Sequence, residues 1–259
     1  MYPFINLGPI QIPVYGLLAV VGFALALYVA TFSCKLYRFP LMDCAFAAIF
    51  AGIGIIVGAK ALYVITVLPN LPQWIKDGYS LTEIVMALFA GLVFYGGFIG
   101  ALVGAFIYCK MYHLHFLGFL NIMVPSIPLF HSIGRLGCFF AGCCYGIEYH
   151  GFGAVKFPYN ELVPELSEVS RFPVQLFEAG LNFLLFIGLF IYSRKKRKPG
   201  SLLGIYLICY AIIRFSLEML RGDVARGIFF GISTSQWISL LLIPVGVFFI
   251  LRKEKVSAD

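Results

Sequence analysis

Charged residues are scarce in this chain of 259 residues: they make up 12% of it, against about a quarter of an ordinary soluble domain. Hydrophobic residues make up 61%. So few polar side chains cannot coat the surface of a soluble globule. The composition therefore excludes a soluble domain and predicts an integral membrane protein.

The chain also lacks the patterns of several other classes of protein. Its formal charge of +7 comes from basic residues in short clusters between apolar runs, so we expect no nucleic-acid partner. No basic segment precedes the first apolar run, residues 14–33, so we expect no cleavable signal peptide. No internal repeat is visible, which argues against an inverted-repeat transporter.

Apolar stretches of about 20 residues recur from end to end, and each is long enough to cross a bilayer as a helix. They predict an all-α integral membrane protein of about seven transmembrane helices, built as a single polytopic membrane domain over residues 1–259. The expected spans are residues 12–33, 44–68, 84–108, 116–140, 174–192, 200–220 and 235–251.

Basic residues between the expected spans predict the orientation. Eleven lie on one side, within residues 35–38, 110, 194–198 and 252–255, and five lie on the other: Lys76, Lys156, Arg171, Arg221 and Arg226. Because the side richer in Lys and Arg faces the cytoplasm, we expect the amino terminus outside and the carboxyl terminus in the cytoplasm.

The longest loop, residues 146–172, is then extracytoplasmic. It is mildly acidic, since it contains Glu148, Glu161, Glu165 and Glu168 against Lys156 and Arg171. Loops of this length without regular structure are often functional, so this loop is a candidate cap or substrate-access element.

Five charged residues fall inside expected spans, where an isolated charge costs roughly 2.5 to 3.5 kcal/mol. They are Lys60, Arg135, Glu178, Arg214 and Glu218. Arg214 and Glu218 are four residues apart and therefore share a helix face, on which we also expect Arg221. Such a face suits a phosphate or another anionic head group; the alternative is a structural ion pair with a snorkelling arginine. Lys60 and Glu178 are expected to form an intramembrane support pair.

Glycines are dense around Arg135, at positions 134, 137, 142 and 146. Each costs about 1 kcal/mol relative to Ala in a helix, so we expect the helix to break here. Free backbone N–H groups beside Arg135 would then form an anion cradle; the alternative is close helix packing. At Gly96 and Gly97 we favour packing, because Gly96 and Gly100 have the small-xxx-small spacing.

Seven cysteines lie inside or at the ends of apolar runs, which argues against a disulfide framework. The pair Cys143 and Cys144 has three interpretations. Inert buried thiols are favoured; the others are a thiolate stabilised by Arg135, and a metal site that includes Cys138 and His131. We expect neither metal nor cofactor, because zinc ligand pairs usually show Cys-x-x-Cys spacing.

Six segments, in order along almost the whole chain, resemble those of the bacterial prolipoprotein diacylglyceryl transferases. PVYGLLAVVGFALA resembles the first span, with Tyr15 in its Tyr-Gly pair, and IIVGAKALYVI has Lys60 where the family has Arg. FYGGFIGA resembles the His-Gly-Gly or Tyr-Gly-Gly segment and contains Tyr95. RFPVQLFEA, GSLLGIYLICYAIIRFSLEMLR and STSQWISLLLI resemble the segments before and within the last three spans.

The family signature, Gly-Arg-x-Gly-Asn-Phe-x-Asn-x-Glu, is altered to GRLGCFFAGC. Gly134, Arg135, Gly137 and Phe139 are kept. Cys138 and Ala141 replace the two Asn, and Cys143 replaces the Glu. Tyr95 stands where a His is often found. The resemblance therefore carries over the fold and the phosphate-binding arginines better than the catalytic detail.

The resemblance implies a multi-pass enzyme of the bacterial inner (cytoplasmic) membrane that moves the diacylglyceryl group of phosphatidylglycerol onto the lipobox cysteine of a prolipoprotein signal peptide. Arg135 and Arg214 would stabilise the departing phosphate, and Glu218 would orient Arg214. Tyr95 would relay a proton or donate a hydrogen bond. Cys143, if ionised beside Arg135, would restore the charge of the missing Glu.

The residues expected at the site fall into two groups. The expected catalytic residues are Arg135, Arg214, Glu218, Tyr95 and Cys143. The expected lipid-binding residues are Tyr15, Lys60, Gly96, Gly97, Gly134, Gly137, Cys138, Gln175 and Arg221. Three alternative functions stay open: a related transferase with another acceptor, a membrane protein that binds or moves lipid without chemistry, and a thiol-redox membrane protein.

Overall fold

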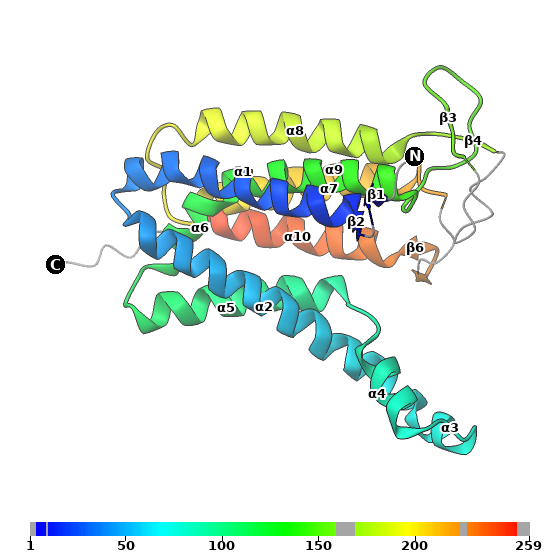
Figure 1. Ribbon diagram of the computed structural model, residues 1–259. Coiled ribbons are helices and arrows are strands. Elements are labelled where there is room, and N and C mark those ends of the chain that lie inside the picture. The colour runs from blue at the N-terminus through cyan, green and yellow to red at the C-terminus, as the bar shows by residue number, and fades with distance from the viewer. Residues whose placement is uncertain (1–3, 9, 159–168, 223–226, 253–259) are drawn as a thin grey trace. The chain divides into compact units, whose positions relative to one another are not determined.

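The computed structural model of the chain describes residues 4–8, 10–158, 169–222 and 227–252 (Figure 1). It is mostly helical and divides into two compact units. The large unit comprises Met1–Arg38 with Leu120–Asp259, and the small unit comprises Phe39–Phe119. The single membrane domain expected from the sequence stays a prediction.

Within the described residues, six helices are long and apolar enough to cross a membrane: Val14–Tyr37, Leu41–Lys76, Phe116–Ala141, Val174–Tyr192, Ser201–Glu218 and Thr234–Leu251. A shorter apolar helix covers Tyr95–Met111. Together they confirm a helical, multi-pass membrane protein. The count of seven spans and the orientation stay predictions.

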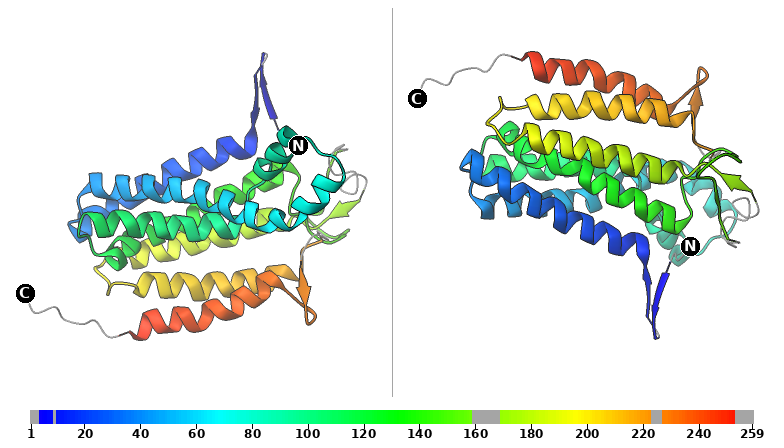
Figure 2. Two further views of the ribbon diagram at one scale, coloured as in Figure 1. Left: turned by 90° about the horizontal axis from the view of Figure 1, so that it is seen from below. Right: turned by 90° about the horizontal axis from the view of Figure 1, so that it is seen from above.

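The large unit is a layer of long helices that run side by side (Figure 2). Its helices are α1 (Val14–Tyr37), α7 (Ile127–Ala141), α8 (Val174–Tyr192), α9 (Ser201–Glu218) and α10 (Thr234–Leu251). Helix α7 packs against α1 and α8, and α9 packs against α8 and α10. This arrangement places α8 beside both α7 and α9, the helices that together with α8 carry Arg135, Glu178, Arg214 and Glu218.

Short antiparallel hairpins accompany these helices. The paired strands are β1 (Phe4–Leu7) with β2 (Ile10–Pro13), β3 (Val155–Lys156) with β4 (Ser170–Arg171), and β5 (Ile228–Phe229) with β6 (Ile232–Ser233). The pair β3–β4 lies in the expected loop 146–172. Of the acidic residues in that loop, Glu161, Glu165 and Glu168 lie outside the described residues.

A buried amide inside the large unit connects two of its turns. Helix α6 (Phe116–Met123) and the turn η2 (Val124–Ser126) lead into α7. On α6, the fully buried Asn121 donates to the carbonyl of Lys198 at 2.9 Å and accepts the N–H of Gly200 at 3.1 Å. Because an unpaired buried amide is costly, this clasp holds α6 against the turn between α8 and α9.

The small unit is built on two helices that pack through glycines. Its elements are α2 (Leu41–Val67), η1 (Leu68–Asn70), α3 (Leu71–Lys76), α4 (Leu81–Phe89) and α5 (Phe94–Met111). A Cβ on Gly96 would collide with the carbonyl of Gly58, and one on Gly100 with the carbonyl of Gly54. The packing expected of Gly96 and Gly100 is confirmed, because only glycine lets the two backbones approach this closely.

The expected span 84–108 is wrong as one continuous helix, since α4 ends at Phe89 and α5 begins at Phe94. The backbone groups freed by this break find partners on α2. The ammonium group of Lys60 donates to the carbonyls of Phe89 and, at 3.1 Å, of Gly91, and the N–H of Val93 donates to the carbonyl of Ala59 at 3.2 Å. A broken helix at membrane depth survives only with such partners.

Candidate active site

Helix α7 carries Arg135 without interruption, so the helix break expected around Arg135 is wrong. Gly134 and Gly137 lie inside α7, and the helix ends only at Ala141, where Gly142 takes the left-handed conformation with φ 75°. Close helix packing, the alternative to a helix break, explains Gly137. A Cβ at this position would press against the Tyr15 ring of α1. The anion cradle of free N–H groups is therefore not formed around Arg135.

Arg135 instead forms an ion pair with Glu178 of α8. Its Nη2 lies 3.0 Å from Oε1 of Glu178, whose side chain is 4% exposed. The support pair expected between Lys60 and Glu178 is therefore wrong, because Glu178 holds Arg135 and Lys60 binds backbone carbonyls. A carboxylate this deeply buried needs a charged, hydrogen-bonding partner, and Arg135 supplies it.

A second ion pair lies on α9, where Nη2 of Arg214 is 2.7 Å from Oε2 of Glu218. The side chains are 11% and 3% exposed, so this pair is also nearly buried. The expected i,i+4 pair is confirmed. In the described part of the chain, the buried Nη1 of Arg214 has no hydrogen-bond partner. The guanidinium group is thus held on one side and available on the other.

Arg221 does not share the helix face of Arg214 and Glu218, because α9 ends at Glu218. Its backbone N–H donates to the carbonyl of Glu218 at 3.3 Å, and Arg221 forms an isolated bridge with Gly146. The expectation that Arg221 shares this helix face is therefore wrong. The bridge nevertheless ties the end of α9 to the segment after α7.

His131 lies on α7, close enough to Arg135 and Arg214 to interact electrostatically with both. Its ring packs on that of Tyr210, with centroids 5.2 Å apart and an angle of 30° between the planes. Its buried Nδ1 has no hydrogen-bond partner among the described residues. The sequence analysis missed Tyr210, although its position one helical turn before Arg214 is a signal that could have found it.

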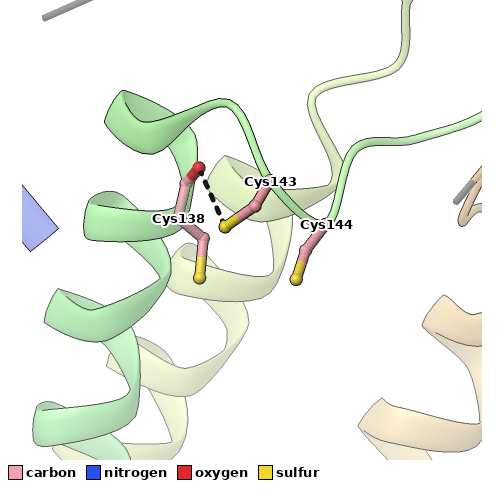
Figure 3. Close-up of side chains that lie close together, drawn as sticks. All are labelled: Cys138, Cys143 and Cys144. Carbon is pink, nitrogen blue, oxygen red and sulfur yellow. Dashed lines mark hydrogen bonds between the residues drawn. The ribbon is translucent and has the colours of Figure 1, made fainter. Parts of the chain in front are cut away.

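Three cysteine side chains meet where α7 ends. Cys138 lies in the last turn, and Cys143 and Cys144 follow the helix; all three Sγ atoms lie within 4.8 Å of one another (Figure 3). We call this group the thiol cluster. Gly142 and Cys144 both have left-handed backbones, with φ 75° and 57°, and this reversal brings residues 143 and 144 back to Cys138.

Side-chain and backbone contacts fix the thiol cluster in the large unit. The thiol of Cys143 donates to the carbonyl of Cys138 at 3.7 Å, and Nε2 of the fully buried Gln175 donates to the carbonyl of Cys143 at 3.0 Å. Gln175 lies one turn before Glu178 on α8, so the same helix positions both Arg135 and the cluster.

The two cysteines after α7 differ in acidity. The thiols of Cys138 and Cys143 hydrogen-bond to Cys144 and, with the nearby Arg135 and Arg221, lower the pKa of Cys144. The same sharing of protons among the three thiols, together with burial, raises the pKa of Cys143. Among the alternatives left open by the sequence, a thiolate is therefore favoured at Cys144 rather than at Cys143, because the hydrogen bonds and the arginines lower the pKa of Cys144.

The segment after the cluster is hydrogen-bonded to the residues that follow α9. The N–H of Ile147 donates to the carbonyl of Leu220, and the N–H of Gly222 to the carbonyl of Tyr145, both at 3.0 Å. The Arg171 guanidinium lies 4.5 Å from the centre of the Tyr145 ring. Tyr145 and Phe157 are buried together, so this part of the loop 146–172 has a small core of its own.

The structure therefore brings together the expected site residues of the large unit: Tyr15, Gly134, Arg135, Gly137, Cys138, Cys143, Gln175, Arg214, Glu218 and Arg221. Tyr15 interacts electrostatically with Arg135, Cys138 and Cys143. The remaining four, Lys60, Tyr95, Gly96 and Gly97, belong to the small unit. Their position relative to Arg135 stays a prediction.

Two nearly buried arginine–glutamate pairs among apolar, membrane-length helices define a multi-pass membrane protein with ion pairs inside its helical layer. Comparison with known proteins identifies the family. The prolipoprotein diacylglyceryl transferase family model matches residues 3–252, and the chain belongs to this family.

Individual relatives agree with this assignment. The phosphatidylglycerol–prolipoprotein diacylglyceryl transferase of Clostridium tetani is 38% identical over 78% of this chain and 77% of its own length. The enzymes of the same name from Cupriavidus metallidurans and Legionella pneumophila are 30% and 29% identical; they cover 93% and 95% of this chain and 89% and 96% of their own lengths. The resemblance noted in the sequence is confirmed.

Proposed function

We propose that this chain transfers the diacylglyceryl group of phosphatidylglycerol to the lipobox cysteine thiol of prolipoproteins in the bacterial cytoplasmic membrane. Its family and the names of its relatives support both substrates. In this reaction the thiol sulfur forms a bond to the glycerol carbon, and the bond from that carbon to the phosphate oxygen breaks. The electron pair leaves with glycerol phosphate, and the thiol proton is released.

The observation that carries the proposal is the geometry of Arg214. Glu218 holds one side of its guanidinium group, while Nη1 stays buried and unengaged within the described chain. The leaving phosphate gains negative charge as the carbon–oxygen bond breaks. A fixed, desolvated guanidinium stabilises this charge more in the transition state than in bound phosphatidylglycerol, and such differential binding accelerates the reaction.

Arg135 is the second group proposed to bind the phosphate. Glu178 fixes it from α8, as Glu218 fixes Arg214 from within α9. Both carboxylates are then positioning residues, because each acts through its arginine. His131, which lies close to both arginines, is a candidate hydrogen-bonding partner for the lipid head group.

The other expected residues receive proposed roles at the edges of this site. Tyr15, Gly134, Gly137, Cys138, Gln175 and Arg221 would line the lipid head group, and Lys60, Tyr95, Gly96 and Gly97 would contribute from the small unit. The altered signature favours a second candidate, a phosphatidylglycerol-dependent transferase with another acceptor. The thiol cluster is the specific observation behind it, since cysteines occupy the signature positions.

The test is direct. Purified chain is incubated with phosphatidylglycerol labelled in its acyl chains and with a lipobox peptide, and the labelled product is identified by mass spectrometry. A thioether on the peptide cysteine supports the proposal, and its Cys→Ser peptide is the control. Label on a different acceptor would favour the second candidate. In cells, failure to lipidate a model prolipoprotein in a strain without its own transferase would contradict the proposal.

A further inference from the structure

The thiol cluster is the one group of three or more potential metal ligands found among the described residues. Its sulfurs lie within 4.8 Å of one another, and Figure 3 shows the three sulfur atoms close together at the end of α7. A zinc ion bound by three thiolates at about 2.3 Å in tetrahedral geometry would need sulfurs roughly 3.8 Å apart. Binding would therefore require side-chain rotations that bring the sulfurs up to about 1 Å closer together.

We propose that the thiol cluster binds Zn²⁺ through Cys138, Cys143 and Cys144, and that the open fourth position binds the acceptor thiol. This inference rests on the proposed function. Spacing alone had argued against a metal, because the pattern Cys-x-x-x-x-Cys-Cys lacks the usual ligand pair. The left-handed backbones of Gly142 and Cys144 remove that objection, since they fold residues 143 and 144 back onto α7.

Three protein ligands distinguish this site from a structural zinc site. Structural sites are closed by four protein ligands, whereas catalytic sites have three and keep one position for water or substrate. The group comprises three cysteines and no fourth His, Cys, Asp or Glu from the described chain. Soft thiolate ligands select zinc over magnesium, calcium or manganese.

The surroundings of the cluster suit the charge of this complex. Zinc with three thiolates has a net charge of −1, and a fourth thiolate makes it −2. Arg135 and Arg221 lie close enough to Cys144 to interact electrostatically with it, so two cations lie near the cluster. The hydrogen bond from Gln175 to the carbonyl of Cys143 holds the ligand segment in place, as supporting contacts do around metal sites.

Zinc would deprotonate the acceptor thiol, a task for which this chain lacks the histidine often found at the position of Tyr95. A thiol that coordinates the ion is deprotonated, so its proton passes to solvent before the transfer step. The sulfur then attacks the glycerol carbon of phosphatidylglycerol, the carbon–oxygen bond breaks, and glycerol phosphate leaves beside Arg135. The acceptor cysteine would therefore be activated by the metal rather than by a histidine at the position of Tyr95.

The first experiment measures metal in the full-length chain purified in detergent. We expect about one zinc per chain by elemental mass spectrometry, and less than a tenth of that in the Cys138→Ser/Cys143→Ser/Cys144→Ser variant. Cys209→Ser, a change on α9 outside the cluster, is the matched control and should keep its zinc. If the triple variant fails to fold, Cys143→Ser alone tests the site. When zinc is supplied below saturation, this variant should retain at most about a tenth of the zinc bound by the wild type.

The second experiment examines the open position. Replacing zinc with Co²⁺ should give the intense thiolate-to-cobalt absorption, and a lipobox peptide should increase it while its Cys→Ser peptide does not. Wild-type chain without zinc, or containing a disulfide among these three cysteines, would overturn the proposal, as would full transfer by the chelated enzyme. Bound zinc without transfer to prolipoprotein would instead refute the proposed function and leave the metal site standing.

Discussion

The carboxylate of Glu218 lies 2.7 Å from the guanidinium group of Arg214, one helical turn earlier on α9, while Nη1 of that group is buried without a hydrogen-bond partner in the described chain. We expect Arg214→Ala and Arg135→Ala each to lower the rate of lipid transfer at least tenfold. A lost charge-assisted hydrogen bond costs roughly 1.5 to 3 kcal/mol, which corresponds to this factor. Turnover of labelled phosphatidylglycerol measures it.

Arg214→Lys sharpens this prediction, because lysine keeps the charge and loses the planar fork of donors. Its rate should fall between those of the wild type and Arg214→Ala. Lys195→Ala, an exposed change in the turn after α8, is the control and should leave the rate unchanged. Equal rates for wild type, Arg135→Ala and Arg214→Ala would remove both arginines from the site.

The ion pair between Arg135 and Glu178 makes a prediction about stability. Glu178→Gln leaves a buried guanidinium without its counter-charge, and breaking a buried pair in this way costs roughly 3 to 5 kcal/mol. The melting temperature in detergent should fall clearly. Glu148→Gln, on an exposed carboxylate, should not change it. The double variant Arg135→Leu/Glu178→Leu should melt above the single variant; if it melts below, the loss is one of packing and not of charge.

Glycine packing in the small unit can be tested with two changes on one helix. A Cβ on Gly54 would collide with the carbonyl of Gly100, whereas a Cβ on Gly52 meets nothing within 4 Å. Gly54→Ala should therefore destabilise the protein by about 1 to 3 kcal/mol, as overpacking does. Gly52→Ala should be neutral or slightly stabilising, since alanine favours the helix. Identical thermal unfolding of the two variants would contradict the close contact between α2 and α5.

Composition and periodic apolar runs predicted most of the fold, because bilayer thickness constrains helix length strongly. The break between Phe89 and Phe94 escaped prediction for a physical reason. The segment is apolar throughout, and the groups that stabilise the break, Lys60 and the carbonyl of Ala59, come from another helix. The binding of Lys60 to backbone carbonyls could not be predicted from the sequence, because a buried ammonium group can equally well pair with a carboxylate.

The candidate site, like the fold, was predictable from the sequence only in part. The Arg214–Glu218 pair was predictable, because spacing of four residues fixes a shared helix face. The partner of Arg135 was not, since Glu178 lies 43 positions later and only the packing of α7 on α8 joins them. The thiol cluster depends on two left-handed residues, and non-glycine residues such as Cys144 adopt that conformation too rarely to be anticipated.

The orientation predicted from basic residues stays open to a simple experiment. We expect residues 194–198, between α8 and α9, to face the cytoplasm. A single cysteine at position 195 in a cysteine-free background should then resist an impermeant thiol reagent in intact cells and react after lysis. A cysteine at position 150, in the expected extracytoplasmic loop, should show the opposite pattern. Labelling of position 195 in intact cells would reverse the topology.

Acidity within the thiol cluster predicts which cysteine reacts first when metal is removed. Exposure alone favours Cys143, which is more accessible than Cys144. Ionisation favours Cys144, because its pKa is lowered and its thiolate persists at a pH below the ordinary range for thiols. The pKa of Cys143 is raised, so this thiol keeps its proton at a pH above that range. Since the thiolate is the nucleophile, we expect iodoacetamide to modify Cys144 first at pH 7.

The pH dependence separates these two explanations. Peptide mapping in the presence of a chelator, from pH 6 to 10, should show the rate at Cys144 falling only at the lowest pH and the rate at Cys143 rising only at the highest. The Arg221→Gln variant removes one of the cations that lower the pKa of Cys144, so its rate profile should move to higher pH. If Cys143 is modified first at every pH, accessibility controls the reaction, and the arginines do not stabilise a thiolate in the cluster.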